Sequence, residues 1–158
     1  MQTTAVEITL MDPDLHVEEF REIYRRAYQR LPRYGYRRDR EINTYLHWLK
    51  KRAGGEFVVA LVAEKPVGFM AVDSNWLTWT GRCLGEIHEI VVDPDYQGCG
   101  IGRQLFLAGL DVLRRSDHKK FELWVGEKND RARAFYESLG FHCKGKWGRW
   151  VQMVREEN

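Results

Sequence analysis

Cysteine is scarce in this sequence, and long apolar runs are missing. The three cysteines, Cys83, Cys99 and Cys143, are widely spaced, and none belongs to a Cys-x-x-Cys pair of the kind that holds zinc or carries out redox chemistry. We therefore expect reduced thiols, no metal site and a cytoplasmic location. The N-terminal stretch MQTTAVEITLMDPD lacks the basic start and apolar block of a secretory signal, and no apolar run is long enough to cross a bilayer, so we expect no membrane partner.

A large excess of either charge is also missing. Lysine and arginine together number 25 and aspartate and glutamate 23, which gives a net charge of +2. This balance does not favour nucleic acid as a partner, because proteins that bind an extended polyanion usually carry a strong basic field. A small anionic ligand remains open. The length of 158 residues and the hydrophobic fraction of 44% predict one domain over residues 1–158, as a monomer or a homodimer.

Apolar periodicity predicts an alternation of strands and helices along the chain. Strands are expected over residues 5–10, 56–63, 67–77, 82–92, 119–125 and, as a pair, 141–156; helices are expected over residues 12–31, 40–55, 101–113 and 129–140. The resulting order, β-α-α-β-β-β-α-β-α-β-β, predicts an α/β (α+β) fold in which helices cover the faces of a mixed sheet.

The stretch DPDYQGCGIG, residues 93–102, places three glycines at alternate positions between a strand that ends at Val92 and a helix that starts near Ile101. A helix N-terminus presents unpaired amides and a partial positive charge, and glycines let an anion approach the backbone closely. These features predict a site for a pyrophosphate. A tight turn whose glycines only relieve backbone strain is the structural alternative.

Spacing excludes two well-known phosphate loops. The dinucleotide fingerprint G-x-G-x-x-G would need a third glycine where Arg103 stands, and it normally follows the first strand of a domain. The Walker loop needs a lysine and a hydroxyl residue directly after its last glycine, and here Arg103 and Gln104 follow Gly102.

The segment QGCGIG, from Gln97 to Gly102, resembles the Q/R-x-x-G-x-G/A signature of the GNAT superfamily of N-acetyltransferases, in which this loop holds the pyrophosphate of acetyl-CoA. The signature positions match at Gln97, Gly100 and Gly102. A second segment, NDRARAFYESLGF over residues 129–141, is similar to the other half of that family's acetyl-CoA site. The resemblance implies an acetyl-CoA-dependent N-acetyltransferase built on a mainly antiparallel central sheet of about seven strands, flanked by about four helices.

The resemblance also implies which residues contact acetyl-CoA. They comprise a strand segment whose backbone pairs with the pantetheine arm, the glycine loop and part of the last helix: Ile90, Val91, Val92, Gln97, Gly98, Cys99, Gly100, Ile101, Gly102, Arg103, Asn129, Ala132 and Tyr136. Cys99 is interpreted as a small loop residue, because no base or partner cysteine is implied. Tyr136 occupies the position at which the family's tyrosine protonates the departing CoA sulfur, and core packing is its structural alternative.

A proton acceptor is needed as well, because only about one alkylamine molecule in a thousand is unprotonated at neutral pH. The resemblance implies Glu86, then His88, then Glu89, in that order of preference, and a partly solvated strand position is the alternative for each. In a regular strand Glu86 and His88 point to one face and Glu89 to the other, but the family's strand often bulges here, which could bring Glu89 round. Trp124 stands where one peptide-modifying branch carries a catalytic glutamate, so that branch's chemistry does not transfer.

The acceptor stays open among a peptide N-terminus, a lysine side chain, a polyamine and a small amino compound. An acidic peptide is favoured if the arginines at 33, 37, 38 and 40 face the cleft. A cationic amine is favoured if Glu86, Glu89 and Glu122 dominate it. A non-catalytic acetyl-CoA-binding sensor or scaffold is the alternative to an enzyme, and it would bind acetyl-CoA without transferring its acetyl group.

Overall fold

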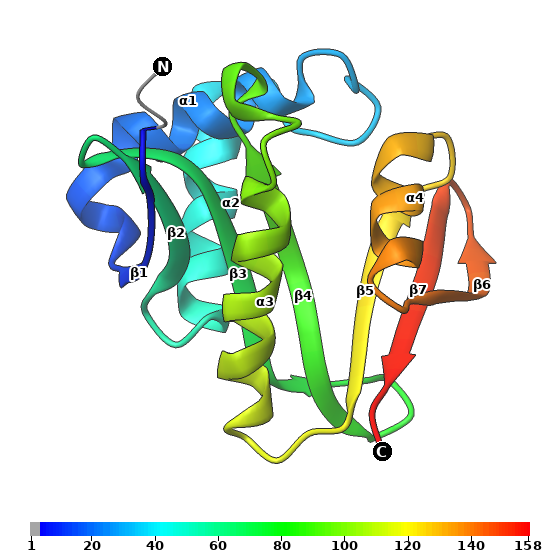
Figure 1. Ribbon diagram of the computed structural model, residues 1–158. Coiled ribbons are helices and arrows are strands. Elements are labelled where there is room, and N and C mark those ends of the chain that lie inside the picture. The colour runs from blue at the N-terminus through cyan, green and yellow to red at the C-terminus, as the bar shows by residue number, and fades with distance from the viewer. Residues whose placement is uncertain (1–3) are drawn as a thin grey trace.

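The computed structural model describes residues 4–158, which form seven strands and four α-helices in the predicted order (Figure 1). The strands are β1 (Val6–Met11), β2 (Phe57–Val62), β3 (Lys65–Leu77), β4 (Cys83–Val92), β5 (Lys120–Gly126), β6 (His142–Trp147) and β7 (Trp150–Glu156). The α-helices are α1 (Val17–Tyr28), α2 (Asp39–Arg52), α3 (Ile101–Arg114) and α4 (Asp130–Ser138). None of the helices within residues 4–158 is long and apolar enough to span a membrane.

The first predicted helix is shorter than its sequence pattern suggests. Asp12 caps a separate 3-10 turn, Pro13–His16, by accepting a hydrogen bond from the backbone of Asp14, and α1 starts only at Val17. The end signals of the last helix are confirmed: Asn129 caps α4, and Gly140 follows it in the left-handed conformation with a φ of 89°.

All seven strands form one sheet in the order β1-β2-β3-β4-β5-β7-β6. Every neighbouring pair is antiparallel except β4 and β5, which run parallel, so the predicted mixed and mainly antiparallel sheet is confirmed. The parallel pair is held together only from Gly85 to Ile87 on β4. Beyond that point the two strands diverge and leave a V-shaped gap in the sheet (Figure 1).

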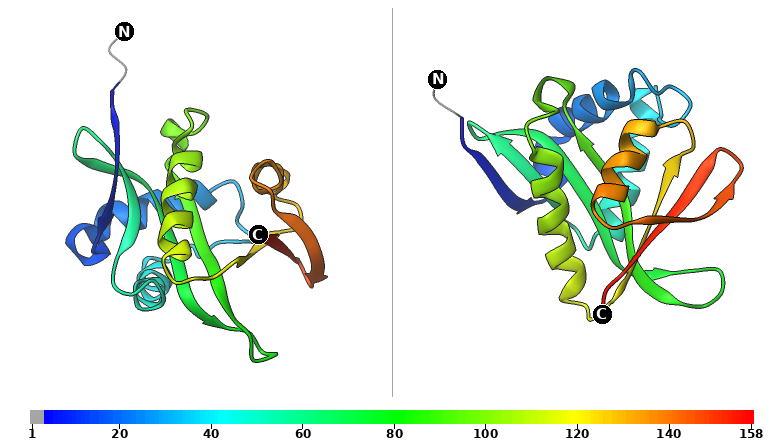
Figure 2. Two further views of the ribbon diagram at one scale, coloured as in Figure 1. Left: turned by 60° about the horizontal axis from the view of Figure 1, so that its bottom comes forward. Right: turned by 45° about the vertical axis from the view of Figure 1, so that its right-hand side comes forward.

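Helices cover both faces of the sheet: α3 and α4 lie on one face and α1 and α2 on the other (Figures 1 and 2). The core under α3 includes Leu105, Phe106 and Phe121, and the core under α1 and α2 includes Phe20 and Phe69. The strand residues in the second core come from β2, β3 and β4 within the described part of the chain. The α1/α2 face of β5 and β7 is therefore left to line a cleft.

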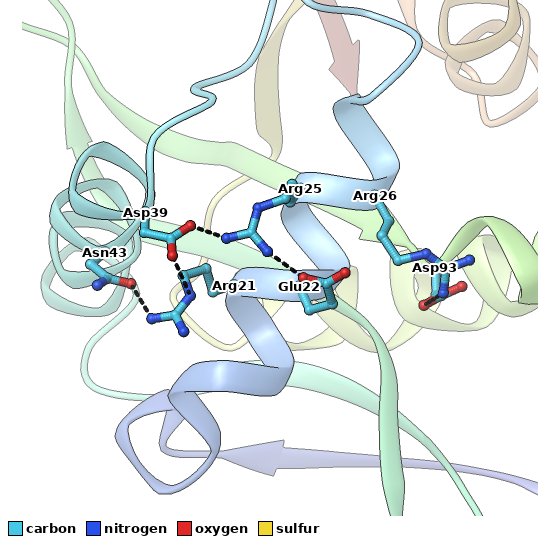
Figure 3. A network of polar contacts seen from close by, with 7 residues as sticks. All are labelled: Arg21, Glu22, Arg25, Arg26, Asp39, Asn43 and Asp93. Carbon is cyan, nitrogen blue, oxygen red and sulfur yellow. Dashed lines mark hydrogen bonds and ion pairs between the residues drawn. The ribbon is translucent and has the colours of Figure 1, made fainter.

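A network of charged side chains fixes α1 against its neighbours (Figure 3). Arg25 pairs with Glu22 one turn away and with Asp39 at the start of α2. Arg26 points the other way and pairs with Asp93, directly after β4, at 2.8 Å. Helix α1 is thus tied both to α2 and to the beginning of the glycine loop.

Candidate active site

A cleft of about 670 Å³ opens where β4 and β5 part. Its floor is formed by both strands, one side by α1 and α2, and the opposite side by the start of α4. The cleft brings together most of the residues predicted to act in catalysis or to contact acetyl-CoA along the strands and last helix: Glu86, His88, Glu89, Ile90, Asn129, Ala132 and Tyr136. The glycine loop lies outside its lining, at the end of β4.

Strand β4 bulges inside this cleft. Ile87 and Glu89 pair with consecutive residues of β3, which leaves His88 as the extra residue. The bulge turns Glu89 to the same face as His88, so that Glu89 meets Tyr28 of α1 and the His88 ring packs against Trp48 of α2. The strand is not regular here, so the bulged alternative applies and Glu89 comes round to the face of His88.

Glu89 is the best-held carboxylate in the cleft. It is 8% exposed, and its two oxygens accept hydrogen bonds from the hydroxyls of Tyr28, at 2.6 Å, and Tyr45, at 2.9 Å. Burial raises the pKa of Glu89, the two tyrosine hydrogen bonds partly oppose that rise, and the balance lies at about 7. Glu89 therefore exchanges its proton near neutral pH.

Glu86 lies deeper, where β4 still pairs with both neighbours. It stands opposite Asp73 of β3 and Glu122 of β5, is 3% exposed, and its Oε2 has no hydrogen-bond partner within residues 4–158. Burial, followed by the negative charges of Glu122 and Asp73, raises the pKa of Glu86 to about 9. Glu86 is consequently protonated at neutral pH.

His88 is anchored through Asp73, a buried carboxylate of β3. Its Nε2 lies 2.9 Å from Asp73, which also accepts a hydrogen bond of 2.7 Å from Arg52. Burial opposes ionisation of Asp73, but these hydrogen bonds outweigh it and hold the Asp73 pKa below its ordinary value. The rings of Trp48 and Trp76 each pack edge-on to the His88 ring at 4.8 Å. The imidazole is therefore held in place by the hydrogen bond to Asp73 and by the two tryptophan rings.

Tyr136 lines the opposite side of the cleft from α4. Its ring packs against Phe135 and Phe141, so Tyr136 also contributes to the packing of the core, as the alternative interpretation of this residue predicts. Burial, and then the charge of Glu89, raise the pKa of the Tyr136 phenol well above its ordinary value. The phenol keeps its proton at neutral pH and can act only as a hydrogen-bond or proton donor towards a bound thiolate.

The glycine loop has the geometry of an anion site. Gly98 and Gly100 have φ angles of 81° and 84°, in the left-handed region that favours glycine, and a side chain built on either would meet no atom within 4 Å. The space above the loop is therefore open. Gly100 is the N-cap of α3, no side chain caps the helix, and its first turn holds no acidic residue. The first amides of α3 are left for an anion.

Gln97 joins the two segments that the sequence singles out. Its amide donates to the carbonyl of Val92 at the end of β4, at 2.9 Å, and its side-chain oxygen accepts from Arg131 of α4, also at 2.9 Å. Gly102 lies on the side of α3 that faces Phe135 of α4, at ordinary contact distance for an added side chain. The glycine loop and the start of α4 thus form one continuous surface.

The remaining predicted acetyl-CoA residues divide between the two faces of β4 and the loop. Ile90 and Val92 pack towards α3, whereas Val91 packs towards α1 and α2. From His88 onward the β5-facing edge of β4 has no strand partner among residues 4–158, so its backbone groups are free to pair with an extended ligand. Cys99 and Arg103 are exposed on the loop and the first turn of α3.

Sequence reasoning missed the residues that hold the catalytic candidates. Tyr28 and Tyr45 lie in the predicted helices over residues 12–31 and 40–55, and Asp73 lies in the middle of an apolar strand. Their partners are distant in sequence, so no local spacing could have revealed them. A tyrosine at a predicted core position is the one signal available, because a buried hydroxyl usually has a hydrogen-bond partner.

The loop between α1 and α2 closes the cleft at its rim. Tyr34 lies against Gly126 at the end of β5, its ring is 5.3 Å from that of Trp150, and its hydroxyl accepts a hydrogen bond from the backbone of Lys128 at 3.1 Å. The cleft is lined at this rim by Arg33, Tyr34, Tyr36 and Trp150. Two other tryptophans, Trp79 and Trp147, are exposed and do not belong to its lining.

Comparison with known proteins agrees with this architecture. A family model described as Acetyltransferase (GNAT) family matches residues 17–141. An uncharacterized N-acetyltransferase of Methanocaldococcus jannaschii is 39% identical over 140 residues; the match covers 88% of this chain and 62% of that protein, so the chain spans less than two thirds of its relative's length.

Solved structures share the fold over almost the whole chain. The protein PH1933 from Pyrococcus horikoshii OT3 is 39% identical, with a TM-score of 0.85 over 96% of this chain and 99% of that one. The PaiA N-acetyltransferase from Thermoplasma acidophilum, solved in complex with coenzyme A, is 16% identical, with a TM-score of 0.75 over 97% and 99% of the two chains. Since the family model covers most of the sequence and the same fold recurs in a close relative, the chain belongs to the GNAT family of acetyltransferases.

Proposed function

We propose that the protein transfers the acetyl group of acetyl-CoA to a primary amine by direct attack, with Glu89 as the proton acceptor. The observation that carries this proposal is the buried Glu89 carboxylate, held by two tyrosine hydroxyls at the point where β4 and β5 part, with a pKa of about 7. A general base works best when its pKa lies near the working pH. Glu89 meets that condition at neutral pH.

The order of preference among the three candidate proton acceptors on β4 therefore changes to Glu89, His88, Glu86. Glu86 is already protonated at neutral pH, because its pKa is about 9, and so it cannot accept a further proton from the amine. The Nε2 atom of His88 points to Asp73, which does not line the cleft. This nitrogen is therefore turned away from the amine that would attack the thioester. Glu89 lines the cleft and exchanges its proton near neutral pH, so it takes first place.

The reaction needs three contributions from this chain. Glu89 takes a proton from the attacking amine, whose nitrogen forms a bond to the acetyl carbonyl carbon. The β5-facing edge of β4 beyond Ile87, which has no strand partner among residues 4–158, offers a backbone amide to the carbonyl oxygen as negative charge develops there. Tyr136 donates its proton to the sulfur as the carbon–sulfur bond breaks, and its raised pKa keeps that proton available until then.

The residues of the glycine loop fit acetyl-CoA. The open surface over Gly98 and Gly100 and the uncapped N-terminus of α3 suit a pyrophosphate. The free edge of β4 suits an extended arm that carries amide groups, and it leads from the loop to Glu89 and Tyr136. A non-catalytic acetyl-CoA-binding module is the second candidate, since the same loop would serve it.

Two measurements on the purified protein test the proposal. Acetyl-CoA should raise the melting temperature, whereas NAD and ATP should not, because only a ligand that binds the folded state stabilises it. A panel of amines should then gain an acetyl group, detected by mass spectrometry together with release of the free thiol. Binding without any transfer would favour the non-catalytic module, and no selective stabilisation by acetyl-CoA would overturn both candidates.

A further inference from the structure

We propose that the acceptor carries an anionic group close to its amine, and that Arg33 and Arg149 bind this group at the rim of the cleft. The inference rests on the proposed function, since it concerns the second substrate of that reaction. It starts from an unequal distribution of charge: Glu86 and Glu89 are buried in the floor, whereas both arginines line the same cleft with exposed side chains.

The two arginines come from different loops that are fastened together. Arg33 precedes Tyr34 in the α1–α2 loop, and Arg149 precedes Trp150 in the turn between β6 and β7. The rings of Tyr34 and Trp150 lie 5.3 Å apart, so the two loops meet at the residues next to the arginines. The arginines therefore start from neighbouring points on one rim.

This rim lies close to the proposed base. Tyr28 donates to Glu89 through its hydroxyl, and the other end of the same side chain packs against Gly35, where an added Cβ would lie 2.6 Å from the Tyr28 Cβ. A single tyrosine thus reaches from Glu89 to the loop that carries Arg33. An acceptor whose amine sits at Glu89 needs only a short extension to bring a second group to the rim.

Neither arginine has an acidic partner among residues 4–158, in contrast to Arg25, Arg26, Arg52 and Arg114, which all form ion pairs. An arginine presents a planar fork of donors that matches a carboxylate or a phosphate. Two unpaired cations at the mouth of a cleft also attract anionic ligands and repel cationic ones. The rim is consequently suited to an anion.

The floor of the cleft does not offer a binding site for a second, cationic group of the acceptor. Glu86 is neutral at neutral pH, and the charge of Asp73 is already matched by Arg52. Glu122 accepts a hydrogen bond from Gln152 and does not line the cleft. Among residues 4–158, Glu89 is left as the single carboxylate that lines the cleft, and the reacting amine uses it. A polyamine would have to place its second charge at the basic rim.

The chemistry shared by suitable acceptors is a primary amine with a nearby carboxylate or phosphate, as in a peptide with an acidic second residue or in an acidic amino compound. The test compares three C-terminally amidated tripeptides, Ala-Asp-Ala, Ala-Asn-Ala and Ala-Lys-Ala, which differ only in one side chain. Free aspartic acid and its diamide form the second arm, which distinguishes a small compound from a peptide as the source of the anion.

In the wild-type protein kcat/KM should follow the order acidic, neutral, basic, and the differences should shrink at high salt because the arginines are exposed. Arg33→Ala and Arg149→Ala should each reduce the preference for the acidic over the neutral peptide by about two- to fivefold. Arg149→Glu should turn it towards the basic peptide, an effect that a merely structural role would not produce. Arg37→Ala is the matched control, since Arg37 belongs to the same loop but lines a separate cavity of about 490 Å³.

Equal kcat/KM for acidic and neutral acceptors, or a preference that survives removal of both arginines, would overturn the inference while leaving the acetyltransferase proposal intact. If no amine is acetylated, the proposed function fails, and the inference is then judged by calorimetric binding of the same peptides to the protein saturated with CoA. Charge-dependent binding that is lost in Arg33→Ala and Arg149→Ala supports it, and binding indifferent to peptide charge rules it out.

Discussion

At the scale of single residues, Glu89 is held between two opposing influences. Burial makes its ionisation costly, and the hydroxyls of Tyr28 and Tyr45 recover part of that cost, which leaves the pKa at about 7. Glu86, three positions earlier on the same strand, has no hydrogen bond to one of its oxygens and has two acidic neighbours, and its pKa rises further, to about 9. Hydrogen bonding thus keeps the pKa of Glu89 below that of Glu86.

The exchange Glu89→Gln tests this assignment. Removing the proton acceptor should lower kcat by about 10²- to 10⁴-fold while the KM for acetyl-CoA changes little. The matched control is Glu86→Gln, which replaces an already protonated carboxyl by a neutral amide and should keep kcat within a few-fold of the wild type. Steady-state kinetics with a saturating amine measure both. A loss in Glu86→Gln as large as that in Glu89→Gln would contradict the assignment.

The pH dependence of turnover follows from the same pKa. Below pH 7 Glu89 carries a proton and cannot accept another, so kcat should rise with pH through a limb centred near 7. A limb at this pH does not by itself distinguish a carboxylate from an ordinary histidine, whose pKa is about 6.5. The variant His88→Gln makes the distinction, because the limb should persist in it. Disappearance of the limb in His88→Gln would assign the base to that histidine.

Tyr136→Phe tests the proposed proton donor. Without the phenol the thiolate must leave unprotonated, and kcat should fall at least about tenfold while the KM for acetyl-CoA and the melting temperature stay near their wild-type values. The loss should shrink when the acetyl group is offered on a more acidic thiol, which leaves readily without a proton. A loss that is equal for both thioesters would point to a packing role for this ring.

At the scale of elements, the α1–α2 loop is positioned by a glycine on a different element. An added Cβ at Gly126, at the end of β5, would run into the ring of Tyr34, although the backbone there is not in the left-handed region. The Tyr34 ring in turn packs on Trp150 of β7. Because Gly126 has no side chain, the α1–α2 loop can pack closely against β5 and β7.

Gly126→Ala should accordingly displace the loop and damage the acceptor side of the cleft. We expect the KM for the amine to rise several-fold and to rise more than the KM for acetyl-CoA, whose pyrophosphate is proposed to bind at the glycine loop and not at the α1–α2 loop. Gly145→Ala is the control, since an added Cβ there meets nothing within 4 Å. Kinetics with each substrate varied in turn measure the split. An equal rise in both KM values would indicate a global disturbance.

At the scale of the whole molecule, the buried carboxyl Glu86 couples folding to pH. Its folded pKa of about 9 lies above its ordinary value of 4.5, so between these limits the folded state holds a proton that the unfolded state releases. Stability therefore falls as pH rises across this window, by a total on the order of a few kcal/mol from this group. Below pH 4.5 Glu86 no longer makes the stability depend on pH, because the residue is protonated in both the folded and the unfolded state.

Glu86→Gln should remove this dependence. The variant should melt at a higher temperature than the wild type at pH 8, and the difference should narrow towards pH 5, where the unfolded wild-type residue also starts to bind its proton. Glu56→Gln, at an exposed position, should leave the curve unchanged. Calorimetric melting from pH 5 to pH 9 provides the measurement, and parallel curves for the wild type and Glu86→Gln would refute the coupling.

The sequence by itself determined the order of the elements, the sheet's mixed character, the caps of α4 and the glycine loop. These follow from periodicity and from residues such as Asn129 and Gly140 that act on their immediate neighbours, so local physical chemistry was sufficient. The same holds for the family: the motifs at Gln97–Gly102 and at Asn129–Phe141 are local patterns, and the family model over residues 17–141 agrees with them.

Only the tertiary structure decided how the three acidic and basic candidates on β4 differ. The bulge at His88 comes from pairing with β3, the hydroxyls that hold Glu89 come from α1 and α2, and the partner that holds His88 is Asp73. Proton affinity depends on burial and on partners that lie 15 to 61 residues away in the chain, and these are fixed when the sheet and helices pack. A sequence motif can therefore locate the strand that carries the candidate bases, whereas the packing of three other elements, β3, α1 and α2, sets how strongly each of them holds a proton.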